Sequence, residues 1–206
     1  MTMKSKITGL IALFFLILSS ASFYGCGYNT LVSMEEQVNS AWSQVENQYQ
    51  RRADLIPNLV STVQGSADFE KSVLTEVTDA RSRVGQMNIT ADDLSDPEKF
   101  AAFQNAQDQL SSALSRLLVV AENYPQLKSN ENFLQLQSQL EGTENRISVE
   151  RRRFNETVQS YNTQVRSFPS LISAKIFGFK EKEYFKSVAG SEKAPDVNFD
   201  FNKKEK

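Results

Sequence analysis

Apolar side chains recur every three or four residues through the first half of this chain, and that spacing constrains the fold more than any other feature. Between residues 31 and 63 the nine steps from one apolar position to the next average about 3.6 residues, the period of an α-helix. No stretch before the C-terminal tail alternates strictly between apolar and polar residues, as a half-buried strand would. We predict one long helix with a single apolar face, formed by Leu31, Met34, Val38, Trp42, Val45, Tyr49, Ala53, Ile56, Val60 and Val63.

Three more segments with similar spacing follow, and they predict three further helices. They span approximately residues 68–85, 97–124 and 130–168. The last segment alternates intervals of three and four residues, a heptad-like pattern that favours nearly parallel packing of helices. We therefore predict an all-α fold in which residues 29–168 form an antiparallel up-and-down four-helix bundle with long helices, preceded by an N-terminal membrane segment and followed by an irregular C-terminal tail.

Two prolines carry local predictions about these helices. Pro97 stands between Asp96 and Glu98. An N-capping acid, a first-turn proline and an acid near the positive end of the helix dipole together predict a helix start there. Pro57 lies inside the first helix and has no N–H to donate to the carbonyl of Ala53. We expect a bend in the helix at Pro57.

Residues 1–28 contain an apolar run that predicts a membrane segment. Lys4 and Lys6 precede the run, and no charged residue follows it before Glu35. This distribution favours an N-terminus in the cytoplasm, with everything from residue 29 onward outside it. The apolar positions that we assign to the segment are Ile7, Leu10, Leu13, Phe14, Phe15, Leu16, Leu18 and Phe23.

Cys26 leaves three forms of the N-terminus open. A lone cysteine after an apolar run, with Gly25 before it, resembles the acylation site of a bacterial lipoprotein. Phe23 and Tyr24 are bulkier than the residues that usually precede such a cysteine, which favours an uncleaved single-span anchor. The third form is a clipped, soluble protein. The first two forms tether the domain to membrane lipid.

The absence of histidine excludes several classes of function. Without it the chain has no Ser-His-Asp or Cys-His catalysis, no His-based metal site and no histidine pH switch. The single cysteine permits no intrachain disulfide and no thiolate cluster. The net charge of −2 argues against a nucleic-acid partner, which would require a basic surplus. Phosphate-binding glycine motifs are also missing, so we predict neither cofactor nor metal.

Charged residues on the first and fourth predicted helices form the candidate site. Glu150 occupies an apolar-stripe position, so its buried carboxylate would need a cationic partner. Arg146 lies one turn earlier, and Arg51 or Arg52 could reach it from the first helix. We predict an inter-helix polar network that holds the two helices in register and consists of Arg51, Arg52, Asp54, Glu144, Arg146 and Glu150.

A carboxylate site is the alternative interpretation of these residues. Glu144 with Glu141, or Glu46 with Glu150, could hold a hard cation or share a proton. Di-iron helical bundles combine such carboxylates with Glu-x-x-His, which this chain lacks. The nearby arginines would also repel a cation. We therefore favour the structural network.

An aromatic-rich segment at residues 169–188 follows the predicted bundle. Apolar stretches of this kind usually pack, so we expect a short helix that folds back over the end of the bundle. Residues 189–206 are predicted to be a disordered tail. Within the tail, residues 197–201 alternate apolar and polar side chains and could add as a strand to the sheet of a partner.

Several short motifs resemble the LemA family. The most specific matches are QRRADLIPNLV at residues 50–60 and LEGTENRI at residues 140–147. Shorter matches are Tyr28-Asn29, Ala80-Arg81, Arg153-Phe154-Asn155 and Phe177-Gly178-Phe179. Together they are distributed over nearly the whole of residues 28–185. The resemblance implies a bacterial, membrane-associated, four-helix up-and-down domain, and it brings neither an enzymatic activity nor a catalytic residue.

From these features we expect a membrane-anchored, non-enzymatic interaction or scaffold module of the cell envelope. Its partners would be membrane lipid, through the N-terminal segment, and an unidentified protein. One alternative is a ligand-binding or hydrolytic bundle that uses inward carboxylates. Another is an envelope-stress or lipid-sensing module that uses the aromatic residues at 176–185. A concave pocket with converging polar groups would indicate an enzyme, whereas a filled interior would indicate a scaffold.

Overall fold

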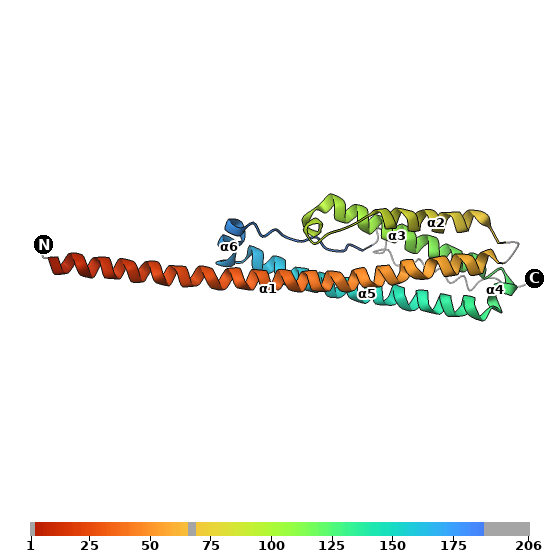
Figure 1. Ribbon diagram of the computed structural model, residues 1–206, viewed down its shortest axis with the longest axis horizontal. Helices are drawn as coiled ribbons and strands as arrows, with labels where there is room; N and C mark the ends of the chain where they lie inside the picture. The colour runs from red at the N-terminus through yellow and green to blue at the C-terminus, as the bar shows by residue number, and fades with distance from the viewer. Residues whose placement is uncertain (1–2, 66–68, 188–206) are drawn as a thin grey trace, which may run out of the picture.

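The fold is entirely helical over the residues that the structure describes. The computed structural model describes the backbone of residues 3–65 and 69–187, and the side chains of residues 27–65 and 69–187. Every regular element within these ranges is a helix and none is a strand (Figure 1). The prediction of an all-α chain is therefore confirmed.

Helix α1 (Met3–Gln64) is the longest element. Its 62 residues form one continuous helix, which at 1.5 Å per residue is about 93 Å long. Figure 1 shows its N-terminal part extending alone beyond the other helices. The side chains of residues 1–26, including Cys26 and most of the predicted membrane segment, lie outside the described residues. Among the side chains that are described, no helix combines the length and apolar character needed to cross a bilayer.

The long helices alternate in direction and associate as two pairs. Helix α5 (Glu131–Arg166) runs antiparallel along α1 (Figure 1). Helices α2 (Lys71–Gln86) and α3 (Pro97–Ala121) form an antiparallel hairpin beside that pair. The heptad-like spacing of α5 agrees with its packing along α1, in which the two helix axes are nearly aligned.

The connections between the helices differ in part from the prediction. The start of α3 is confirmed, because the side chain of Asp96 accepts hydrogen bonds from two backbone N–H groups of the first turn. The loop expected after α2 contains a short 3-10 helix, η1 (Asp92–Ser95). The sequence predicts that the third helix ends near residue 124 and places no further helix before residue 130, yet Pro125 begins a short helix, α4 (Pro125–Lys128). Proline is well suited to a first helical turn, and α3 has already ended at Ala121.

Buried apolar side chains form two adjoining cores along the helices. The first is the aromatic core around Trp42 of α1, whose ring centroid lies 5.5 Å from that of Phe103 and 5.6 Å from that of Phe154. The second core is mainly aliphatic and lies toward the C-terminal end of α1. It draws side chains from five helices, including Ile56, Leu59, Val77, Leu110, Leu117, Leu127 and Leu140.

The chain after α5 forms a short helix and then an extended segment. Helix α6 (Ser170–Phe177) packs against α1 and α5. It ends at Gly178, whose φ of 79° is the left-handed conformation that glycine adopts readily at helix ends. Residues 179–187, here named the C-terminal strap, run back along the helices (Figure 1). Only part of the predicted fold-back segment is thus helical, and the predicted tail at 189–206 lies outside the described residues.

Side-chain amides explain why the strap is extended. Asn155 and Asn162 of α5 each donate to the carbonyl and accept from the N–H of one strap residue, with all four distances 2.9 Å. Gln104 of α3 does the same with Lys186, at 2.7 and 3.1 Å. These amides satisfy backbone polar groups that a helix would otherwise pair internally.

Phe185 joins the strap to the aromatic core, and a substitution tests that role. Its side chain is 7% exposed, and its ring lies 4.9 Å from that of Phe100. We expect Phe185→Ala to lower the free energy of unfolding by about 3–5 kcal/mol, because it leaves a cavity in the core. Tyr184→Ala, at a neighbouring exposed position, should cost less than about 1 kcal/mol. Chemical denaturation of the full-length chain measures both, and equal losses would contradict the assigned role.

Candidate functional site

Arg52 is the most deeply buried charged residue among those described. Its side chain is 1% exposed. Its Nη1 donates to Glu144 Oε1 of α5 at 2.7 Å and to Ser111 Oγ of α3 at 2.6 Å. Its Nη2 donates to the side-chain oxygen of Gln107, also on α3. A buried guanidinium needs both a counter-charge and hydrogen-bond acceptors, so these contacts fix α1 against α3 and α5 together.

Tyr49 and Arg151 form a second group of polar contacts one turn away along α1. Arg151 Nε of α5 donates to Tyr49 Oη at 2.6 Å, and Arg151 Nη2 lies 2.9 Å from Asp108 Oδ1 of α3. The guanidinium carbons of Arg52 and Arg151 lie 5.2 and 5.6 Å from the centroid of the Tyr49 ring, within cation–π range. Burial raises the pKa of the Tyr49 phenol more than the two arginines lower it. The phenol therefore stays neutral near pH 7 and its oxygen accepts from Arg151.

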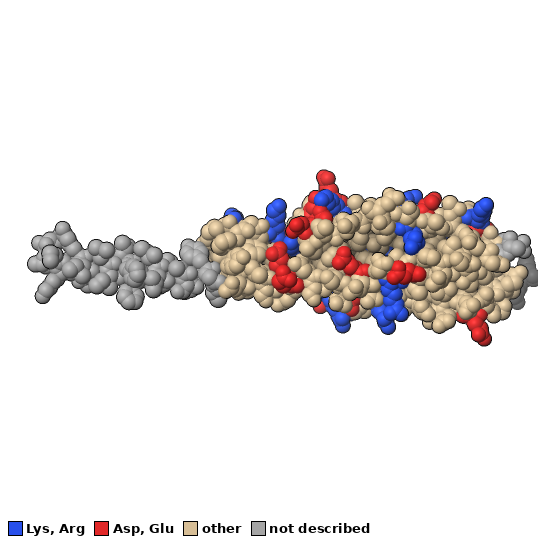
Figure 2. Space-filling model, viewed as in Figure 1, with Lys and Arg blue, Asp and Glu red and all other residues tan. Residues whose placement is uncertain are grey.

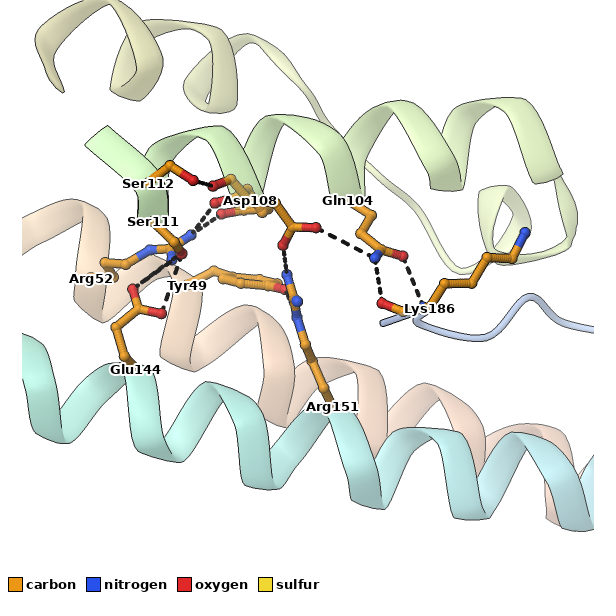
Figure 3. A network of polar contacts seen from close by, with 10 residues as sticks. Tyr49, Arg52, Gln104, Asp108, Ser111, Ser112, Glu144, Arg151 and Lys186 are labelled. Atoms are coloured by element: carbon orange, nitrogen blue, oxygen red, sulfur yellow. Dashed lines mark hydrogen bonds and ion pairs between the residues drawn. The ribbon is translucent and has the colours of Figure 1, made fainter. Parts of the chain in front are cut away.

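A chain of polar contacts joins these two groups to the strap (Figure 3). Asp108 Oδ2 accepts from Gln104 Nε2 at 3.4 Å, and Gln104 binds the backbone of Lys186. The side chains point toward one another between the helices, and the two arginines balance the two carboxylates in charge. We name this set the polar core: Tyr49, Arg52, Gln104, Gln107, Asp108, Ser111, Glu144 and Arg151.

The structure brings together two of the six residues that the sequence suggested for an inter-helix network. Arg52 and Glu144 meet, as described above. Arg51 and Arg146 are exposed. Asp54 accepts a hydrogen bond at 2.8 Å from Gln50 of its own helix. These three therefore contribute no contact between α1 and α5, because their helical positions turn them away from the interface.

The partner predicted for Glu150 is wrong. Its carboxylate accepts from Arg153 Nη1 of the same helix at 2.9 Å, and the Arg153 side chain is 65% exposed. A strict alternation of three and four residues placed Glu150 on the apolar stripe. An α-helix advances by about 3.6 residues per turn, so the stripe drifts from the heptad register. The residue between Ile147 and Phe154 that contacts the neighbouring helices is Arg151, which binds Tyr49 of α1 and Asp108 of α3.

Pro57 does not end α1, and a neighbouring helix satisfies the carbonyl that it leaves unpaired. The helix continues through Pro57 to Gln64. Proline offers no N–H to the carbonyl of Ala53, and Arg81 Nε of α2 donates to that carbonyl at 3.1 Å. The sequence predicted a bend at this position; the structure adds the residue that compensates for the missing donor.

The carboxylates that the alternative interpretation paired have other contacts or surroundings. Glu141 accepts a hydrogen bond from Gln137 Nε2 of its own helix at 3.0 Å. Glu46 lines an open hollow of about 570 Å³ bounded by α1, α2 and α3, and no residue of α5 lines it. Partial burial raises the pKa of the Glu46 carboxyl. Glu150 lies on α5, and Glu144 is bound to Arg52. Among residues 27–65 and 69–187, no group of three or more histidine, cysteine, aspartate or glutamate side chains is arranged to hold a metal.

Sequence reasoning missed the contribution of α3 to the polar core. Polar residues recur on α3 at spacings of three and four, which places them on one face of a helix. They are Gln104, then Gln107 or Asp108, and then Ser111. This polar stripe adjoins the apolar stripe of α3 and was the available signal. Arg151 was harder to recognise, because it begins a run of three arginines and the other two are exposed.

These features define a class of protein in which long antiparallel helices are joined by ion pairs, one of them with a fully buried arginine. The sequence profile of the LemA family matches residues 41–199, most of the chain. The chain belongs to the LemA family, and the resemblance indicated by its motifs is confirmed.

Relatives of known name fall into two groups. "Magnetosome protein MamQ 2" of Paramagnetospirillum magneticum and "Magnetosome protein MamQ" of Magnetospirillum gryphiswaldense are each 29% identical over 174 residues, which is 77% of this chain and 64% of theirs. "Protein LemA" of Metamycoplasma hominis is 26% identical over 140 residues, 68% of this chain and 60% of its own. The chain thus spans less than two thirds of the length of these relatives.

Removing the counter-charge of Arg52 tests the polar core. We expect Glu144→Ala to lower the free energy of unfolding by about 1–3 kcal/mol, because it removes one acceptor and the counter-charge of a buried guanidinium. Glu150→Ala is the matched control on the same helix, and its pairing with an exposed arginine predicts a cost below about 1 kcal/mol. Chemical denaturation compares the two variants. A greater loss for Glu150→Ala would refute this account of the site.

A double-mutant cycle tests the pairing of Arg81 with the Ala53 carbonyl. In the parent chain Arg81→Ala should cost about 0.5–1.5 kcal/mol, the usual contribution of one hydrogen bond. In a Pro57→Ala background the new N–H can pair with that carbonyl, so Arg81→Ala should cost less. Thermal unfolding of the four proteins gives the coupling energy. The same cost in both backgrounds would show that Arg81 does not replace the missing donor.

Proposed function

We propose that this chain is a membrane-anchored, non-enzymatic four-helix-bundle protein that acts as an interaction or scaffold module in the bacterial cell envelope. The observation that carries the proposal is the polar core. Arg52, Glu144, Arg151 and Asp108 come from three helices and pair with one another. A catalytic site directs such groups into a cleft where a substrate enters. Groups that bind each other instead suit the role of fixing helix register.

The N-terminal sequence supports the anchoring part of the proposal. Helix α1 continues from the apolar run at residues 7–24 into the polar core without interruption. If that run spans the membrane, Lys4 and Lys6 would lie on the cytoplasmic side and the domain from residue 29 onward outside the cytoplasm. Acylation of Cys26 would hold the domain at the same place relative to the lipid.

The names of the relatives are compatible with this role. Proteins related to this chain are described as magnetosome proteins, and another simply as LemA. A non-enzymatic module that holds other proteins would suit the assembly of a cellular structure. We therefore propose that this chain holds other proteins together and does not catalyse a reaction.

In-cell photo-crosslinking of the full-length chain in a bacterial host tests the proposal. A crosslinking residue at Val119, which is 65% exposed, is expected to capture a protein neighbour in the membrane fraction. Deletion of residues 2–26 should release the chain to the soluble fraction and abolish the crosslink. Recovery of the full-length chain from the cytosolic fraction would contradict anchoring.

A variant that lacks the Arg52–Glu144 ion pair, used in the same experiment, distinguishes a scaffold from an enzyme. Arg52→Met combined with Glu144→Leu replaces the ion pair by apolar side chains of similar volume, a change that is often neutral for folding. A scaffold should keep the same crosslinked neighbour if thermal unfolding is unchanged. Loss of the neighbour with unchanged unfolding would favour the alternative of a ligand-binding or hydrolytic bundle that uses these charges.

A further inference from the structure

Helix α6 packs on α1 close to the point where the apolar N-terminal run ends. The contact is tight at Gly27, where an added Cβ atom would lie 3.2 Å from Ser173 Oγ. The apolar run ends at Tyr24, three residues earlier, which is about 4.5 Å along the helix axis. A bilayer that contains the run must therefore have its surface at the level of α6.

The outer side of α6 leaves large apolar side chains uncovered. Ile176 and Phe177 are 65% and 57% exposed, and Phe168, just before α6, is 81% exposed. The ring of Tyr28 on α1 lies 4.7 Å from the ring of Phe177 and continues the same surface. Contiguous exposed apolar side chains of this kind mark an interaction surface. We name this surface the α6 patch: Tyr28, Phe168, Ile172, Ile176 and Phe177.

The charged residues within the segments that carry the α6 patch are all basic. Residues 27–34 and 166–180 contain Arg166, Lys175 and Lys180 and no acidic residue. All three basic side chains are exposed, and Arg166 has Glu181 at 3.9 Å. Figure 2 shows the end of the described surface toward the N-terminus mostly free of charged side chains on the face in view.

We propose that the α6 patch lies in the headgroup layer of the bilayer that α1 enters, and that its partner is an anionic phospholipid surface. The inference rests on the proposed membrane anchoring and adds a second contact with the same membrane. Aromatic and aliphatic side chains of the patch enter the boundary between headgroups and acyl chains, while Lys175 and Lys180 meet lipid phosphates. Together, α1 and α6 fix the orientation of the domain on the membrane.

Fluorescence quenching in reconstituted vesicles tests this contact. The full-length chain with Cys26→Ser carries a single environment-sensitive fluorophore on Ile176→Cys, Val119→Cys or Leu13→Cys. Val119 is the matched control, because it has the same 65% exposure as Ile176 but lies near the far end of α3 (Figure 1). The vesicles contain phosphatidylcholine and phosphatidylglycerol with brominated or ordinary acyl chains.

We expect brominated chains to reduce the fluorescence at positions 13 and 176 by about twofold or more, and to leave position 119 unchanged. Quenching at 13 but not at 176 would overturn the α6 contact while leaving the anchor intact. No quenching at 13 would remove the anchor and the α6 contact together. A blue-shifted signal at 176 without quenching would show that protein, such as a second copy of the chain, covers the patch. Equal quenching at 176 in vesicles of phosphatidylcholine alone would overturn the anionic partner.

Discussion

A guanidinium taken out of water destabilises a protein by several kilocalories per mole unless a counter-charge and acceptors replace the lost hydration. Arg52 meets this requirement only where three helices come together. Helix α1 carries the arginine, α5 supplies Glu144, and α3 supplies Ser111 and Gln107. Sliding or rotating any one of these helices would break at least one of the hydrogen bonds of the Arg52 Nη atoms. The polar core therefore specifies one register, and the apolar cores on either side pack within it.

The two helix pairs differ in how they are joined. Helices α1 and α5 lie close along much of their length, as do α2 and α3. The hairpin meets the first pair through side chains. Trp42 of α1 packs on Phe103 of α3, and Arg151 of α5 pairs with Asp108 of α3. The strap then connects the pairs again, because Gln104 of α3 and Asn155 of α5 both bind its backbone. The apolar spacing thus forms the individual helices, and polar contacts between residues distant in the sequence join the two pairs.

The sequence was sufficient to predict the long helices, because burying one helix face imposes the helical period on the apolar residues. It was insufficient on α5, where a strict heptad selected Glu150, although Arg151 makes the contacts with the neighbouring helices and Glu150 pairs with Arg153 of its own helix. Within the candidate site only Arg52 and Glu144 were identified. Their acceptors on α3 depend on which helices are neighbours, and a one-dimensional pattern does not contain that information. The strap was missed because its hydrogen bonds come from amides distant in the sequence.

The continuity of α1 has a mechanical consequence. Each residue of a helix turns the chain by about 100°. The number of residues between the apolar run and Trp42 therefore sets the angle, around the axis of α1, between the domain and the N-terminal segment. A single inserted residue near Gly25 would rotate the domain by about 100°, a little more than a quarter of a turn, around the axis. Because α1 is one unbroken helix about 93 Å long, any tilt of its N-terminal part displaces its opposite end sideways.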